Sequence, residues 1–232
     1  MMFDSLLLTV IIFIPLLGAL LVAAMPGKED HQKNKIRWVT FVTLIIGFLV
    51  SLKIWFGFDT TQAGMQFVVR VPWIEAFGIE YYLGIDGISV LLVLLTTFLG
   101  PLVMAGSWTA IQDRVKGFCI ALLLLQTAML GAFCALDLFL FYVFWELMLI
   151  PLYFIIGIWG GKRRVYAAIK LFVFTMMGSL LMLVGVLYVA INYQTFDILR
   201  LYEAGIAPNE QLMLFGMFSL AFMIKVPMFP FH

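Results

Sequence analysis

The sequence predicts an all-α membrane protein, a multi-spanning helical bundle with about seven transmembrane helices. Of its 232 residues, 64% are hydrophobic and 12% are charged, and the mean hydropathy is +1.10. A soluble globular chain carries roughly 45–50% apolar and about 25% charged residues. The lipid bilayer is therefore the expected solvent for most of the chain. A net charge of +1 gives no indication of a nucleic-acid partner.

Seven apolar stretches are long enough to cross a bilayer, which takes about 20 mostly apolar residues. They are residues 5–24, 38–58, 85–108, 117–135, 138–159, 167–191 and 212–231. The first is expected to be a retained span, because no basic segment precedes it and it has no obvious small-residue cleavage site. We divide the chain into an N-terminal three-helix region, residues 1–116, and a helical bundle, residues 117–232.

Two connections are longer than the others and carry their own structural signals. β-Branched residues on both sides of Gly78 predict a small hairpin over residues 65–84, lying on the membrane surface. Residues 195–205 have apolar residues at helical spacing and predict a short interfacial helix. Asp86 and Asp137 stand just before apolar stretches, where aspartate commonly caps a helix N-terminus.

Lysine and arginine concentrate in the connections after the first, third and fifth stretches. The nine residues are Lys28, Lys33, Lys35, Arg37, Arg114, Lys116, Lys162, Arg163 and Arg164. The positive-inside rule places these connections in the cytoplasm or the mitochondrial matrix. The sequence thus predicts a bacterial inner-membrane protein with a periplasmic N-terminus, with the mitochondrial inner membrane as the alternative.

Two charged residues lie inside apolar stretches, Glu146 in the fifth and Lys225 in the seventh. A charge at mid-membrane costs about 2.5–3.5 kcal/mol on insertion scales. We expect both side chains to face the bundle interior and to pair with each other or with water. One interpretation is a buried pair that only fixes helix register, although such pairs stabilise poorly. The other is a proton relay, because burial and the partner charge act in opposite directions on each charged form.

Prolines follow Lys225 closely in the seventh stretch, at Pro227 and Pro230. Each proline lacks an N–H and displaces the carbonyl four residues back. A broken helix beside an intramembrane lysine is a way to build an ion site in transporters, and a simple proline kink is the alternative. Lys170 either lies on a proton path or extends to the membrane surface. His232, two helical turns after Lys225, is either a relay member or a packed residue.

No metal site is predicted, because neither His31 nor His232 has a nearby cysteine or histidine. Cys119 and Cys134 are interpreted as small apolar core residues.

Four motifs together resemble chain M, or subunit 4, of proton-translocating NADH-quinone oxidoreductase (respiratory complex I), within the Mrp-antiporter-like family. They are YLGIDGIS at residues 82–89, FWELMLIPLY at 144–153, AIKLF at 168–172 and KVPMFPFH at 225–232. The resemblance extends from about residue 81 to residue 232. Each motif alone is weak, and the combination is specific.

The resemblance implies a fold of two inverted five-helix bundles, each with a broken helix. Glu146 matches the family's carboxylate on the fifth span and Lys225 the lysine on the broken seventh span, and these two are thought to act as a coupled pair. Lys170 and His232 match a lysine on the sixth span and a histidine just after the break. The family binds no cofactor or metal in this chain. FMN, iron–sulfur clusters and quinone are expected in other subunits.

Family members are much longer, so the resemblance implies that this is an N-terminal part, with the first repeat only partly present and incomplete at its C-terminal end. We expect a membrane-arm subunit of NADH:quinone oxidoreductase, partnered by other membrane-arm subunits, homologous antiporter-like ones included. It would translocate protons through the Glu/Lys relay, coupled to quinone reduction elsewhere, and hold no redox centre itself. The alternatives are a subunit of an Mrp-type sodium/proton antiporter and a structural membrane scaffold.

Overall fold

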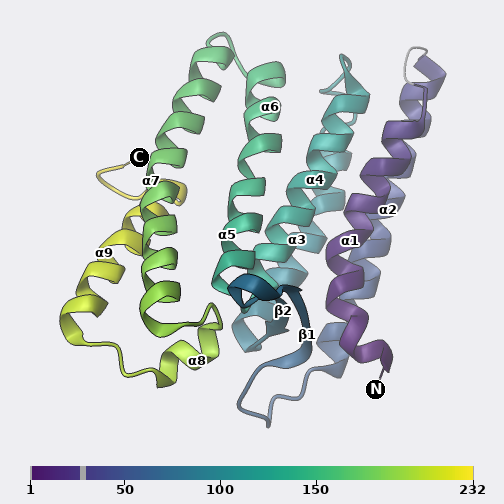
Figure 1. Cartoon of the computed structure of the whole chain (residues 1–232). Coiled ribbons are helices and arrows are strands. Elements are labelled where there is room, and N and C mark those ends of the chain that lie inside the picture. The colour runs from purple at the N-terminus through teal and green to yellow at the C-terminus, as the bar shows by residue number, and fades with distance from the viewer. Residues whose placement is uncertain (1, 27–29, 232) are drawn as a thin grey trace.

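The computed structural model describes residues 2–26 and 30–231 and contains six helical segments long and apolar enough to cross a membrane (Figure 1). Five of them involve α1 (Met2–Ala24), α2 (Asp30–Gly57), α3 (Gly87–Gly106), α4 (Val115–Cys134) and α7 (Arg164–Tyr193). The sixth, Leu138–Trp159, consists of α5 (Leu138–Leu147) and α6 (Leu149–Trp159). These six spans confirm the multi-spanning helical class and the first six predicted stretches.

The seventh predicted stretch differs from its prediction in both of its bounds. Helix α9 begins at Pro208 and ends at Lys225, so Lys225 is its last residue and does not lie well inside a span. The cause is Pro227, which lacks the N–H that would bond to the carbonyl of Met223. That carbonyl instead accepts a hydrogen bond from Met228 N at 2.8 Å. The helix therefore stops where the proline interrupts its hydrogen bonds.

One end of the bundle, called here the hairpin end, carries the two strands and the shortest α-helix. β1 (Gln66–Ile74) and β2 (Ile79–Ile85) pair antiparallel around the one-turn helix η1 (Glu75–Phe77). Helix α8 (Ile198–Glu203) lies at the same end (Figure 1). At the opposite end, called the basic end, the α3–α4 and α6–α7 connections carry arginine and lysine.

Short backbone bridges join the hairpin to the starts and ends of the long helices. Leu136 N donates to Tyr82 O, and Leu138 N donates to Phe196 O. The connection between α4 and α5 therefore lies between β2 and the segment before α8, like an added strand. This arrangement brings the beginning of α5 and the end of α7 together at the hairpin end.

A buried apolar cluster spans α1, β2, α4 and α5 and forms the core beside this junction. Its fully buried members include Leu8, Ile12, Leu83 and Leu130. A second cluster, around Leu44 and Leu123, joins α1, α2 and α4 nearer the basic end. The N-terminal three helices thus pack onto α4, and α5, α6, α7 and α9 lie on its other side (Figure 1).

Candidate functional site

Glu146 stands near the end of α5, a helix whose start is held firmly. Asp137 is the predicted N-cap, and its Oδ1 accepts hydrogen bonds from Phe139 N and Leu140 N at 2.9 Å. Farther along, the ring of Phe144 rests against Gly131 of α4, where a Cβ would lie 2.3 Å from the ring. Only glycine permits this approach of α5 to α4. Glu146, two residues after Phe144, points to another side of the helix.

The helix carrying Glu146 is interrupted immediately after it, at Met148. Pro151 cannot donate to the carbonyl of Leu147, four residues earlier, and α5 ends at Leu147. Met148 N bonds to Glu146 O, and α6 begins at Leu149. This interruption was not predicted, although Pro151 was the signal for it in the sequence. An unpaired carbonyl in an apolar span is tolerated where protein or cavity water satisfies it.

Lys225 is positioned by the packing of α9 along α7. Two glycines of α7 make room for this contact. A Cβ at Gly178 would lie 2.8 Å from Ile224 Cδ1, and one at Gly185 would lie 3.0 Å from the Phe218 ring. Ile224 directly precedes Lys225, so this contact fixes the backbone that carries the lysine.

The ammonium of Lys225 lies against Trp145, the residue next to Glu146. Lys225 Nζ donates to Trp145 O at 3.3 Å and lies 4.7 Å from the centroid of the Trp145 ring. The Glu146 carboxyl group is the charge that acts electrostatically on this ammonium. Within residues 2–26 and 30–231, no direct ion pair joins them, and Glu146 Oε1 is buried without a hydrogen-bond partner. The structure thus places the Lys225 ammonium on the residue next to Glu146, without a salt bridge to the carboxyl group.

Two polar residues that the sequence analysis missed lie beside Glu146. The hydroxyl of Tyr142 interacts with both the Glu146 carboxyl group and the Ser179 hydroxyl of α7. Ser179 is 2% exposed. Tyr142 precedes Glu146 by four residues, so helical spacing placed it on the same face and was the available signal. The site therefore combines an acid, a lysine and two hydroxyl groups from α5, α7 and α9.

Lys170 lines a cavity that Lys225 also lines and that Glu146 does not line. This cavity of about 850 Å³ opens between the start of α7 and the end of α9 and is also lined by Pro227 and Pro230. Lys170 is itself exposed. Three further basic residues from the α6–α7 connection line it, Lys162, Arg163 and Arg164. The cavity gives Lys225 an opening with basic residues at its rim, towards the basic end.

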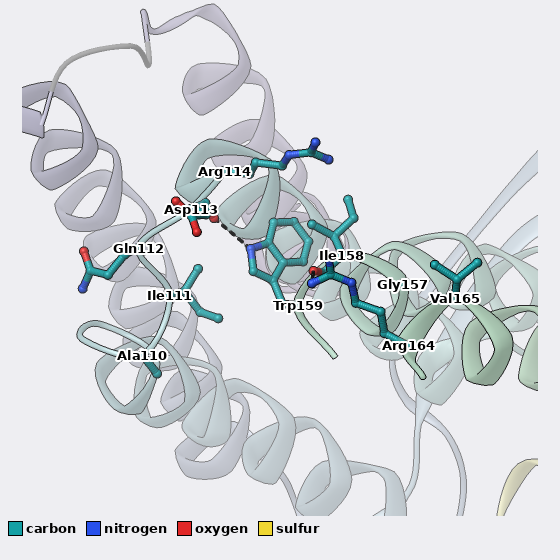
Figure 2. Close-up of a pocket in the computed structure, with 10 residues that line it drawn as sticks. All are labelled: Ala110, Ile111, Gln112, Asp113, Arg114, Gly157, Ile158, Trp159, Arg164 and Val165. Carbon is teal, nitrogen blue, oxygen red and sulfur yellow. Dashed lines mark hydrogen bonds between the residues drawn. The ribbon is translucent and has the colours of Figure 1, made fainter. Parts of the chain in front are cut away.

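A second hollow, of about 610 Å³, lies at the basic end between the α3–α4 and α6–α7 connections (Figure 2). Trp159 Nε1 donates to Asp113 O at 2.9 Å, and Arg114 and Arg164 lie on either side of the indole. Neither Glu146 nor Lys225 lines this hollow. It is therefore separate from the acid–lysine site.

His232 lies outside the described residues, so its predicted place near Lys225 stays a prediction. No group of three or more histidine, cysteine, aspartate or glutamate side chains with the geometry of a metal site occurs in the described part of the chain.

The fold and this site define a class: a multi-spanning helical membrane protein in which a half-buried carboxyl group and a lysine lie near each other beside interrupted helices. A family model described as NADH-ubiquinone oxidoreductase chain 4, amino terminus, matches residues 10–132. A second, described as NADH:quinone oxidoreductase/Mrp antiporter, TM, matches residues 135–232. The chain belongs to the chain 4 (subunit M) family of NADH-quinone oxidoreductase.

Individual relatives agree with the family models. NADH-quinone oxidoreductase subunit M of Rhodobacter capsulatus is 42% identical over 97% of this chain and 46% of its own length. A chain of respiratory complex I from Thermus thermophilus is 28% identical with a TM-score of 0.83, over 97% of this chain and 45% of that one. A chain of the Mrp complex from Dietzia sp. DQ12-45-1b shares the fold, with a TM-score of 0.77 and 22% identity over 98% of this chain and 24% of that one. The chain spans about half the length of the curated relatives it matches.

Proposed function

We propose that this chain moves protons across the membrane as part of the membrane arm of an NADH-quinone oxidoreductase, driven by quinone reduction in other subunits. The observation that carries the proposal is the meeting of Glu146 and Lys225: the ammonium lies on Trp145 O while Glu146 Oε1 is buried and unpartnered. A pair kept for stability alone would close into a direct salt bridge with its remaining hydrogen bonds satisfied. An open pair leaves room for water between the two groups.

The proton passes the groups of the relay in a fixed order. A proton enters from the basic end through the cavity that Lys170 and Lys225 line. It then passes between Lys225 and Glu146, where the Tyr142 hydroxyl contributes to the field around the carboxyl group. A change in the electrostatic field from neighbouring subunits shifts the proton between acid and base. His232 takes part in this relay by the resemblance alone.

The proposed partners, the cofactors of other subunits and the location follow from membership of the family. Partners are other membrane-arm subunits, homologous antiporter-like subunits among them, and the surrounding lipid. FMN, iron–sulfur clusters and quinone belong to other subunits. The protein lies in a bacterial inner membrane, with its N-terminus and hairpin end on the periplasmic side.

The test replaces Glu146 by glutamine in the full-length protein within its complex. Glu146→Gln is expected to leave assembly intact and to abolish or strongly reduce proton pumping and NADH-quinone turnover. Glu203→Gln is the matched control, because Glu203 is an exposed acidic residue of α8. Persistence of assembly, turnover and pumping in Glu146→Gln and Glu146→Ala would refute the proposal.

A subunit of an Mrp-type sodium/proton antiporter is the second candidate, supported by the fold shared with the Dietzia complex. Flavin and iron–sulfur absorbance in the purified native complex supports the respiratory enzyme, and absence of both supports the antiporter. A structural scaffold is the third candidate. It would be favoured if neutralising both Glu146 and Lys225 raised stability without loss of transport.

A further inference from the structure

Gln126 is a buried polar side chain that the proposed relay does not use. It lies near the middle of α4 and is 2% exposed. Both ends of its amide, Oε1 and Nε2, lack a hydrogen-bond partner within residues 2–26 and 30–231. Buried amides in native proteins are nearly always paired with protein or with ordered water. A hydrogen-bond partner for the Gln126 amide is therefore expected close to its oxygen and nitrogen atoms.

The amide rests directly on the backbone of α3 at Gly100. A Cβ at Gly100 would lie 2.4 Å from Gln126 Oε1, so only glycine permits this approach. The next residue, Pro101, lacks an N–H, and the carbonyl of Thr97 consequently loses its regular helical donor. Thr97 is one turn before Gly100 on the helix. An unpaired amide and a carbonyl without its regular donor thus occur at the same level of α3.

A polar contact between α2 and α3 continues from this point. Thr97 Oγ1 lies 2.8 Å from Ser51 Oγ, and both residues are fully buried. Each hydroxyl also lies within hydrogen-bond distance of a carbonyl of its own helix, Val93 O for Thr97 and Phe48 O for Ser51. Each hydroxyl has one proton, so the hydroxyl that donates to the other one does not also donate to its own carbonyl. Ser51, Thr97 and Gln126 thus place buried polar groups on α2, α3 and α4, and these three residues are called here the polar line.

We propose that this line contains an internal hydration site between α3 and α4. A water molecule accepts a hydrogen bond from Gln126 Nε2 and donates one to the carbonyl oxygen of Thr97. Water is the ligand that fits, because it both donates and accepts and needs only two to four polar partners. The site is distinct from the Glu146 site, since α4 meets α5 through Gly131 and Phe144 and meets α3 through Gln126.

The experiment compares wild type with Gln126→Met in the full-length protein within its membrane assembly. A cryo-EM map that resolves internal water is expected to show water density at the Gln126 amide, and Gln126→Met is expected to lose it. The variant should also melt about 1–2 °C lower, because the Thr97 carbonyl is left without a partner in a full-length protein about twice as long as this chain. Methionine is unbranched and similar in length, so packing is nearly preserved.

Thr127→Val is the matched control, since Thr127 is equally buried and bonds only to Leu123 O of its own helix, at 3.1 Å. It should keep the water density at Gln126. Two results overturn the proposal: a wild-type map that shows other internal waters but none at Gln126, or a Gln126→Met protein that melts higher than wild type. The second would mean that the amide is dry and costs stability.

Discussion

Replacing Asp137 by alanine tests how the start of α5 is held. The side chain is 1% exposed, and its two oxygens accept three backbone N–H groups. Loss of an N-cap costs about 0.5–2 kcal/mol. The third bond, from Glu80 N at 3.2 Å, ties the hairpin to α5. Leaving that partly buried donor unpaired adds about 1 kcal/mol. We expect Asp137→Ala to lower the free energy of unfolding by about 1.5–3 kcal/mol.

The assay is chemical denaturation of the full-length protein in detergent micelles, followed by fluorescence. Asp86→Ala is the control, because Asp86 caps α3 through Ile88 N and Ser89 N but makes no third bond to another element. Its expected loss is about 1 kcal/mol. If the two alanine variants lose equal stability, the tie between hairpin and α5 contributes nothing and the reasoning fails.

Three other predictions concern packing, a surface contact and pH. Gly131→Ala should displace the Phe144 ring, because its Cβ would lie 2.3 Å away, and should lower the melting temperature and proton transport together. Glu210→Gln weakens the hydrogen bonds that Tyr188 and Tyr193 donate, so the melting temperature should fall by less than in Gly131→Ala. Hydrogen bonds from Ser89 N and Ile88 N lower the pKa of Asp86 below its ordinary 3.8. The ionised Asp86 carboxylate therefore stabilises the fold fully above pH 3.8, and this stabilisation is lost as pH falls through the lowered pKa. The melting temperatures of wild type and Asp86→Asn should converge under strong acid.

The sequence predicted the elements whose signals are local and strong. Six spans, the cap at Asp137 and the hairpin around Gly78 all follow from hydropathy, capping preference and β-propensity. The end of α9 was misplaced because the apolar stretch continues to residue 231, whereas backbone hydrogen bonding stops at Pro227. Hydropathy measures solubility in lipid and contains no term for a missing N–H.

The acid–lysine site was predicted in its residues but not in its geometry. The cost of a charge in lipid identifies Glu146 and Lys225, and it does not indicate whether they form an ion pair. The backbone carbonyl of Trp145 accepts a hydrogen bond from Lys225 Nζ. The presence of a tryptophan in the sequence does not indicate that role, because every residue has a backbone carbonyl. Contacts of this kind depend on how α9 packs against α5 and α7, which is decided by tertiary structure.

The interruption at Met148 determines where the Leu138–Trp159 span can bend. Its beginning is attached by Asp137 and by the Leu138 N–Phe196 O bond, and its first half is held by Phe144 against α4. The carbonyl of Leu147 has already lost its regular donor, so flexing there costs one helical bond fewer than flexing an unbroken helix. Any tilt of α6 is therefore concentrated at Leu147 and Met148, just beyond Glu146, and α5 keeps its packing on α4 while the segment towards the basic end changes direction.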